Sequence, residues 1–164
     1  MKNITTRQIA LNGIVAGLYA GLTILIAPLS YGNIQCRISE ALCLLVCIEP
    51  SLTVGLTLGC LIANLFSTVS VLDIFIGTSA TLIGCLLTTH IRKPWLAPLP
   101  TILSNGILVG AMLAWVFGGE TVFWKSFLIF GAEVAAGEAV ALYVLGVPLL
   151  LTMRKTNAIG KFLK

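Results

Sequence analysis

The sequence carries little charge. Only 10% of its 164 residues are Asp, Glu, Lys or Arg, whereas 58% are hydrophobic. A soluble domain has about 25% charged residues, so this composition argues against an ordinary soluble globular protein. Membrane-spanning helices need roughly 20 apolar residues each, which leaves room for about six of them. We therefore expect a single all-α integral membrane domain over residues 1–164.

Signatures of nucleotide-dependent chemistry are also absent from the sequence. It contains no GxxxxGK[ST] phosphate loop and no GxGxxG motif that opens a helix. If the protein does energised work, the energy therefore comes from elsewhere. We expect neither an enzyme nor a bound cofactor, and no nucleic-acid partner. The five cysteines include no CxxC pair and there is a single histidine, so we expect no metal site.

Six hydrophobic segments can be separated by Pro, Gly and polar stretches. We expect spans at about residues 8–27, 39–48, 51–68, 72–91, 101–117 and 126–153. The second segment is only about ten residues long, too short to cross a membrane alone, and it stops at Glu49-Pro50. We interpret it as a broken or tilted helix that still counts as a crossing.

The basic residues predict the orientation. Six crossings place both termini on one side, together with eight of the ten basic residues: Lys2, Arg7, Arg92, Lys93, Arg154, Lys155, Lys161 and Lys164. By the positive-inside rule this side is the cytoplasm. Arg37 and Lys125 then lie outside.

Two acids interrupt the last hydrophobic segment. Glu133 and Glu138 lie where a lipid-facing helix should carry no charge, because an ionisable group at the bilayer centre costs roughly 2.5–3.5 kcal/mol. Five residues on a helix correspond to about 140° of rotation and roughly 7.5 Å of rise, so the two acids do not share one face. They predict a site for a ligand that is cationic or rich in N–H donors. A proton relay is the alternative, but a relay generally uses a longer chain of titratable groups.

A polar stretch before the second segment is charged on the predicted outer side. Tyr31, Gln35, Arg37 and Glu40 are candidates for ligand contacts in a lid over an extracellular cavity. The alternative is a local ion pair between Arg37 and Glu40 at a helix start.

Two other polar residues have separate interpretations. Asn105 is a candidate ligand contact, because an amide can bind a purine-like edge. Asp73, near the start of a segment, is expected to cap that helix rather than to bind a ligand.

The first segment carries small residues at four-residue spacing. Gly13, Gly17 and Gly21 form one row, and Ala16 and Ala20 form a second row beside it. Such rows let helix backbones approach closely. They predict either packing inside the bundle or a smooth docking surface for a helix of a partner protein, with Gly13, Ala16, Gly17 and Ala20 as the candidate contacts.

Five stretches carry a wider pattern: LNGIVAGLYAGLT, SYGNIQCRISEALCLL, GLTLGCLIANLFS, IFIGTSATLIGCLL and AAGEAVALYVLGVPLLL. Together they resemble the QueT family, the substrate-binding subunits (S components) of energy-coupling factor (ECF) transporters. The resemblance covers nearly the whole chain. Its most specific parts are the stretch from Gln35 to Glu40 and the pair Gly137-Glu138.

The resemblance implies a six-helix S-component bundle with a short second helix, located in the plasma membrane of a bacterium and surrounded by lipid. It implies capture of a queuosine precursor from outside the cell, preQ1 above all or else queuine or queuosine. The implied partners are a transmembrane scaffold subunit and two ATP-binding-cassette ATPases. PreQ1 is a 7-deazaguanine derivative whose guanine-like edge offers two adjacent N–H groups to one carboxylate, and whose cationic arm suits a second. The alternative function is a self-contained, proton-coupled secondary transporter of a cationic small molecule.

Overall fold

The chain folds as a helical bundle. The computed structural model describes residues 5–27, 37–118 and 122–163, and every regular element within these ranges is a helix. Three helices are long and apolar enough to cross a membrane, namely Thr6–Leu25, Pro98–Gly118 and Phe123–Thr156. Three apolar helices are shorter, namely Ile38–Cys47, Leu52–Asn64 and Leu72–Thr88. The all-helical, apolar architecture expected from the composition is therefore confirmed.

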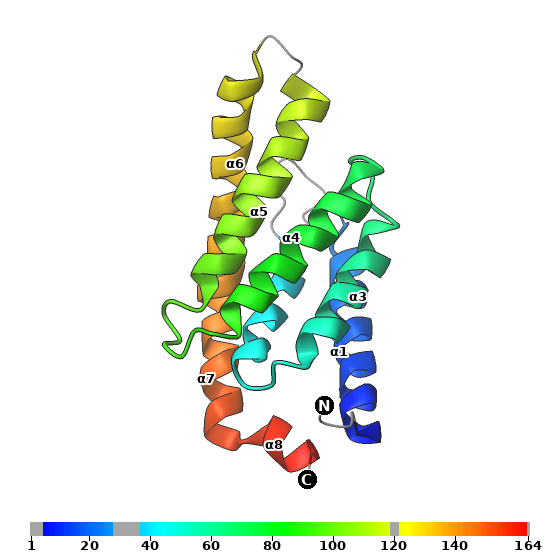
Figure 1. Ribbon diagram of the computed structural model, residues 1–164, viewed down its shortest axis with the longest axis vertical. Coiled ribbons are helices and arrows are strands. Elements are labelled where there is room, and N and C mark those ends of the chain that lie inside the picture. The colour runs from blue at the N-terminus through cyan, green and yellow to red at the C-terminus, as the bar shows by residue number, and fades with distance from the viewer. Residues whose placement is uncertain (1–4, 28–36, 119–121, 164) are drawn as a thin grey trace.

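The order of the elements follows the hydrophobic segments of the sequence. They are α1 (Thr6–Leu25), η1 (Ile38–Cys47), α3 (Leu52–Asn64), α4 (Leu72–Thr88), α5 (Pro98–Leu113), η2 (Ala114–Gly118), α6 (Phe123–Val140), η4 (Ala141–Gly146), α7 (Val147–Thr156) and α8 (Ala158–Leu163). In Figure 1, α5 lies between α4 and α6, and α1 lies beside α3.

Glycines of α3 allow α1 and α3 to pack closely. The backbone N–H of Gly55 donates a hydrogen bond of 2.7 Å to Asn12 Oδ1 on α1. A Cβ atom added to Gly59 would lie 2.7 Å from the carbonyl oxygen of Ala16, closer than real Cβ contacts. Only a glycine fits at this helix crossing, so the two backbones approach as a small-residue interface permits.

The short second helix lies inside the bundle. η1 is a 3₁₀ helix of ten residues, and at about 2.0 Å per residue it is about 20 Å long, less than the roughly 30 Å of a hydrocarbon core. It is the cyan segment in Figure 1 and contacts α1, α4, α7 and η4. Cys43, Leu44 and Val46 are completely buried. η1 therefore positions its polar residues in the protein interior.

The last helix is continuous but changes its winding. α6, η4 and α7 form one helix of 34 residues from Phe123 to Thr156, longer at both ends than the expected span at residues 126–153. The η4 segment is π-helical, and Pro148 follows it at the start of α7. Pro148 has no N–H to donate to the carbonyl of Val144, so the α-helical hydrogen-bond pattern is interrupted there. The π-helical turns of η4 come directly before this interruption.

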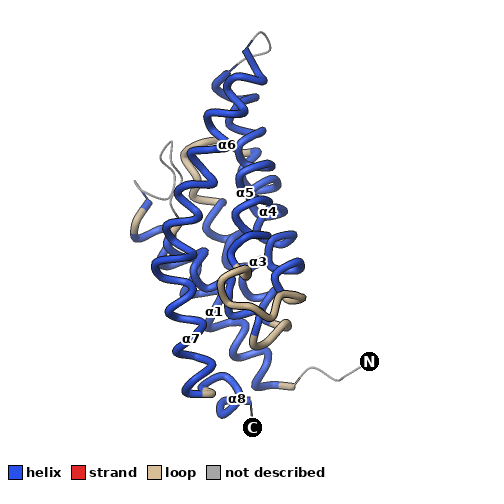
Figure 2. Tube along the Cα trace, turned by 90° about the vertical axis from the view of Figure 1, so that its left-hand side faces the viewer, coloured by secondary structure: helices blue, strands red, loops and turns tan. Residues whose placement is uncertain are grey.

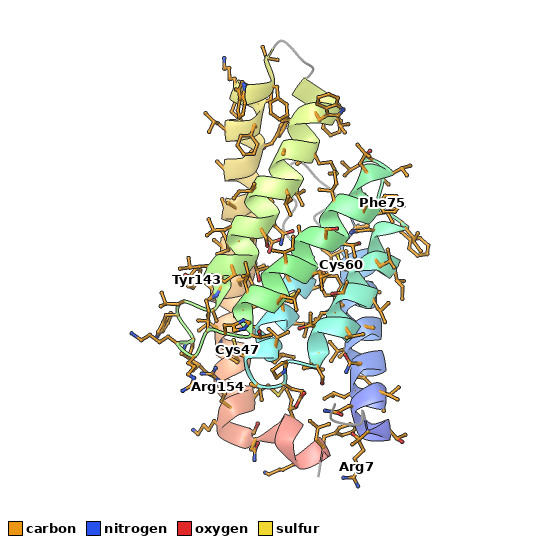
Figure 3. The ribbon with its side chains drawn as sticks, viewed as in Figure 1. Arg7, Cys47, Cys60, Phe75, Tyr143 and Arg154 are labelled. Carbon is orange, nitrogen blue, oxygen red and sulfur yellow. The ribbon has the colours of Figure 1, made fainter. Side chains whose placement is uncertain are left out.

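The two ends of the described chain lie at the same end of the bundle. The start of α1 and the short helix α8 are both at the bottom of Figures 1 and 2. Figure 3 shows Arg7 and Arg154 toward this end as well. The chain reverses into α8 at Asn157, which adopts the left-handed conformation with φ 51°.

Candidate functional site

Glu40 lies at the centre of a group of buried polar side chains. The hydroxyl group of Tyr19 donates a short hydrogen bond to Glu40 Oε1, and Thr81 Oγ1 donates to the same oxygen at 2.9 Å. The thiol of Cys43 lies 3.0 Å from Glu40 Oε2. Tyr19, Thr81 and Glu40 are all 0% exposed. The three donors come from α1, α4 and η1, so the fold holds this carboxylate in one orientation.

A buried ion pair lies beside this carboxylate. Arg37 Nη2 is 2.9 Å from Asp73 Oδ2 and 3.1 Å from Asp73 Oδ1, and Ser67 Oγ donates to Oδ2 at 2.7 Å. Arg37 Nη1 also points to the sulfur of Cys60 at 3.8 Å, and Cys60 lies 3.3 Å from Thr81 Oγ1. Figure 3 shows Cys60 inside the bundle. Cys60 therefore connects the ion pair to the group around Glu40.

This arrangement corrects two expectations from the sequence. Asp73 was expected to cap a helix, but the N-cap position of α4 is Val71, and Asp73 is completely buried against Arg37. Arg37 was also considered as a local partner of Glu40, but its ion pair in the described chain is with Asp73 on α4. Helical spacing suggests only neighbours three or four residues away, whereas this contact joins residues 36 positions apart.

Glu138 is the second buried acid. It lies on α6 with 2% exposure, and its Oε2 atom is buried without a hydrogen-bond partner in the described residues. The charged groups that act on Glu138 are Glu40 and Arg37, so Glu138 lies near the polar group around Glu40. Leaving a buried charged acceptor unpaired costs at least about 1–3 kcal/mol, so such an atom points to a ligand. We call Tyr19, Arg37, Glu40, Asp73, Thr81 and Glu138 the acid cluster.

The formal charges of the acid cluster do not balance. Arg37 and Asp73 compensate each other as an ion pair. Glu40 accepts its hydrogen bonds from uncharged O–H and S–H donors, which stabilise a carboxylate without cancelling its charge. Glu40 and Glu138 therefore remain as two acids that a cation or several N–H donors can satisfy.

The other predicted ligand contacts lie apart from these bonds. Glu133 is half-buried, in agreement with the expected difference in direction from Glu138. Asn105 is buried, and its amide donates to the carbonyl of Thr101 on its own helix at 3.2 Å. Tyr31 and Gln35, the predicted lid contacts, lie outside the described residues.

The small residues of α1 divide between two faces. Gly13 and Gly17 are exposed, and a Cβ atom built on either would meet nothing within 4 Å. Ala16 and Ala20 are only 8% and 6% exposed, and Ala16 packs against Gly59 of α3. The prediction that all four residues form a docking surface therefore needs correction, because the alanine row belongs to the interior of the bundle.

Sequence reasoning missed Tyr19, and it interpreted Thr81 only as a polar side chain that hydrogen-bonds to another helix. Both residues lie in apolar segments, and their role in the cluster depends on contact with Glu40. Grooves between the helices lie elsewhere: one of ≈ 300 Å³ lies between α5 and α6, and another of ≈ 320 Å³ lies between α1 and α3. Neither groove is lined by Glu40 or Glu138.

Comparison with known proteins gives two matches. The model of a family described as QueT transporter matches residues 9–155. A curated protein from Lactococcus lactis subsp. cremoris (strain MG1363), named queuosine precursor transporter QueT, is 36% identical over 85 residues, which is 51% of this chain and 50% of that protein. The match therefore spans about half the length of that relative. No solved structure matches the chain.

Proposed function

Since the chain belongs to the QueT transporter family, we propose that it is the substrate-binding subunit, or S component, of an ATP-driven importer of the energy-coupling factor type. The family is one of transporters rather than enzymes. The proposed substrate is a queuosine precursor, the ligand class in the name of the Lactococcus relative, and specifically preQ1 bound from the extracellular side.

The observation that carries this proposal is the buried Oε2 atom of Glu138, which has no hydrogen-bond partner among the residues that the structure describes. A buried carboxylate without a partner suits a ligand that brings N–H donors, and preQ1 has two adjacent N–H groups on its guanine-like edge. Glu40 supplies a second acid close to Glu138. The cationic arm of preQ1 matches this second acid better than a neutral or anionic ligand would.

The proposed orientation places six crossings in the plasma membrane and both termini in the cytoplasm. Support comes from the basic residues of Arg92, Lys93, Arg154 and Lys155, which lie at or near span ends on one side in this topology. Large apolar side chains such as Leu25 and Leu128 are 80% and 70% exposed, as expected for groups that face lipid. In this orientation the start of α4, which carries Asp73 of the acid cluster, lies toward the outer side, away from the two termini (Figure 1).

The proposed partners are a transmembrane scaffold subunit and two ATP-binding-cassette ATPases. The chain has no phosphate loop of its own, so ATP-driven import needs separate ATPase subunits. The exposed glycine face of α1 at Gly13 and Gly17 is the proposed docking surface, because a helix of a partner can approach it closely.

Calorimetry on the detergent-purified chain tests the substrate. PreQ1, preQ0, queuine and queuosine are titrated into the wild type and into Glu138→Gln, with Glu133→Gln as the matched control. The proposal expects binding of preQ1, at least about 70-fold weaker in Glu138→Gln, because a charge-assisted pair is lost and a ligand donor is left opposite an NH₂ group. The half-buried Glu133→Gln should lose less.

The outcomes separate the candidate functions. Absence of binding to all four compounds by the wild type would remove the queuosine-precursor proposal. Uptake by the chain alone in liposomes, driven by a proton gradient and without ATPases, would instead establish a secondary transporter. Near-wild-type affinity of Glu138→Gln for preQ1 would show that Glu138 does not bind the guanine-like edge of the ligand.

A further inference from the structure

Glu40 and Glu138 differ in how many of their acceptor positions the protein occupies. An ionised carboxylate offers about four lone-pair positions. Glu40 already accepts from Tyr19 and Thr81 on Oε1 and from Cys43 on Oε2. Glu138 has a buried, unpartnered Oε2, and no side-chain hydrogen bond of Glu138 is found within the described ranges. The two acids therefore cannot bind the same kind of ligand group.

Glu138 suits a planar edge with two parallel N–H donors. A bidentate contact needs both carboxylate oxygens, each with a free lone pair directed at the ligand. Glu40 cannot provide this, because Oε1 accepts two hydrogen bonds from the protein. Glu138 can, since no side chain in the described part of the chain forms a hydrogen bond with its carboxylate.

Glu40 suits a single cationic donor. Its three donors in the described residues are uncharged and do not compensate a carboxylate charge. Among these residues, one further position on Oε2 remains beside the weak thiol donor of Cys43. An ammonium group is a compact charge that needs one strong acceptor and does not need a planar pair. Because Tyr19 and Thr81 are completely buried and both donate to Glu40, they fix the position of the Glu40 carboxylate.

We infer that the two acids divide the ligand between them: Glu138 accepts the two adjacent N–H groups of the deazaguanine edge, and Glu40 binds the cationic aminomethyl arm. Tyr19 and Thr81 act as positioning residues, since they orient Glu40 without contacting the ligand. This inference rests on the proposed function, and it assigns the preference for an aminomethyl ligand over a neutral one to the Tyr19–Glu40–Thr81 group.

Three ligands separate the two roles. The first is the 7-aminomethyl-7-deazaguanine preQ1, the second is the 7-cyano analogue preQ0, which has the same edge and no ammonium, and the third is 7-aminomethyl-7-deazahypoxanthine, which lacks the 2-amino group. Dissociation constants are measured by calorimetry for the wild type, Glu40→Gln, Glu138→Gln, Tyr19→Phe and Thr81→Val. Tyr143→Phe is the control, because its hydroxyl donates to the carbonyl of Trp95 outside the cluster.

The expected pattern is specific for each acid. Glu40→Gln lowers affinity for preQ1 by about 10- to 100-fold and changes affinity for preQ0 by less than about threefold. Glu138→Gln lowers affinity for both by similar factors, and its effect shrinks for the deazahypoxanthine analogue, which has already lost the paired donor. Tyr19→Phe and Thr81→Val follow Glu40→Gln in a weaker form. Tyr143→Phe changes none of the ratios.

The failure of this inference differs from the failure of the proposed function. If the wild type binds none of the three ligands, the proposed substrate preQ1 is wrong, whatever the two acids do. If the wild type binds and the two patterns are exchanged, or if each variant weakens preQ1 and preQ0 equally, the division of roles is wrong. Ratios between two ligands within one variant do not depend on how stable that variant is. If Glu40→Gln does not fold, Tyr19→Phe and Thr81→Val decide the question, since equal losses for both ligands in them would indicate a merely structural role.

Discussion

Arg37 and Asp73 form a buried ion pair in which one guanidinium nitrogen, Nη2, lies 2.9 Å from Oδ2 and 3.1 Å from Oδ1 of the same carboxylate. Their side chains are 3% and 0% exposed. Arg37 precedes η1 and Asp73 lies in the first turn of α4, so the pair ties the start of the internal helix to the start of α4. The position of Glu40, three residues after Arg37, depends on this connection.

Removal of one member of this pair should destabilise the protein strongly. We expect Asp73→Leu to lower the free energy of unfolding by about 3–5 kcal/mol, because it leaves the Arg37 charge buried without its carboxylate. The double variant Arg37→Met, Asp73→Leu should recover most of this loss, since apolar replacement of a whole buried pair is often neutral. The measurement is thermal unfolding of the purified chain in detergent, with the half-buried Glu49→Gln as control. If the double variant is no more stable than Asp73→Leu, the unpaired charge of Arg37 is not the cause of the lost stability.

The contact between α1 and α3 makes a second prediction about stability. Gly59→Ala should destabilise the fold by about 1–3 kcal/mol, because its Cβ would lie 2.7 Å from the carbonyl oxygen of Ala16, and a backbone atom cannot move aside cheaply. Gly21→Ala is the matched control on α1, where an added Cβ meets nothing within 4 Å. It should be neutral or stabilising by about 0.5–1 kcal/mol. Thermal unfolding of the two variants measures the difference, and equal effects would show that the crossing is looser than described.

The two small-residue rows of α1 should respond differently to large substitutions. Gly17→Leu should impair energised uptake and co-purification with a scaffold subunit, while ligand binding by the isolated chain survives, because Gly17 faces open space. Ala16→Leu should instead lower the thermal stability of the isolated chain, because Ala16 is buried against α3. Uptake assays in cells and calorimetry on the purified chain give the two readouts. Full uptake and assembly with Gly17→Leu would exclude this face as the docking surface.

Composition and hydrophobic length were sufficient to predict the helical class and the sequence of apolar helices. The chain is 58% hydrophobic, and its long apolar segments are separated at Pro and Gly residues. This pattern is typical of a bundle of membrane-spanning helices. The short second segment was also evident, because Glu49-Pro50 closes it after about ten residues. Helical geometry predicted that Glu133 and Glu138 lie on different faces of the helix, but it did not predict that Glu138 is the buried one.

The contacts of the acid cluster could not be predicted, because they join segments that are distant in the sequence. Tyr19 and Glu40 are 21 residues apart, and Thr81 and Glu40 are 41 residues apart. Sequence spacing reveals partners only within one helix. For the same reason Asp73 was interpreted from its local position at a helix start, and its distant partner Arg37 was missed. The π-helical turn before Pro148 did have a local signal, since a proline within a long apolar run perturbs the helix.

The proposed orientation can be tested by labelling cysteines in intact cells. The five native cysteines are replaced, and single cysteines are introduced at Asn33, Glu120 or Asn157. An impermeant thiol reagent should label the variants at Asn33 and Glu120, because the positive-inside rule places most basic residues, and with them both termini, in the cytoplasm. Asn157, which is exposed beyond the end of α7, should be labelled only after the membrane is permeabilised. That second labelling is the control for reactivity at this position. Labelling of Asn157 in intact cells together with protection of Asn33 would invert the topology and place the acid cluster on the cytoplasmic half, which is incompatible with capture of a precursor from outside.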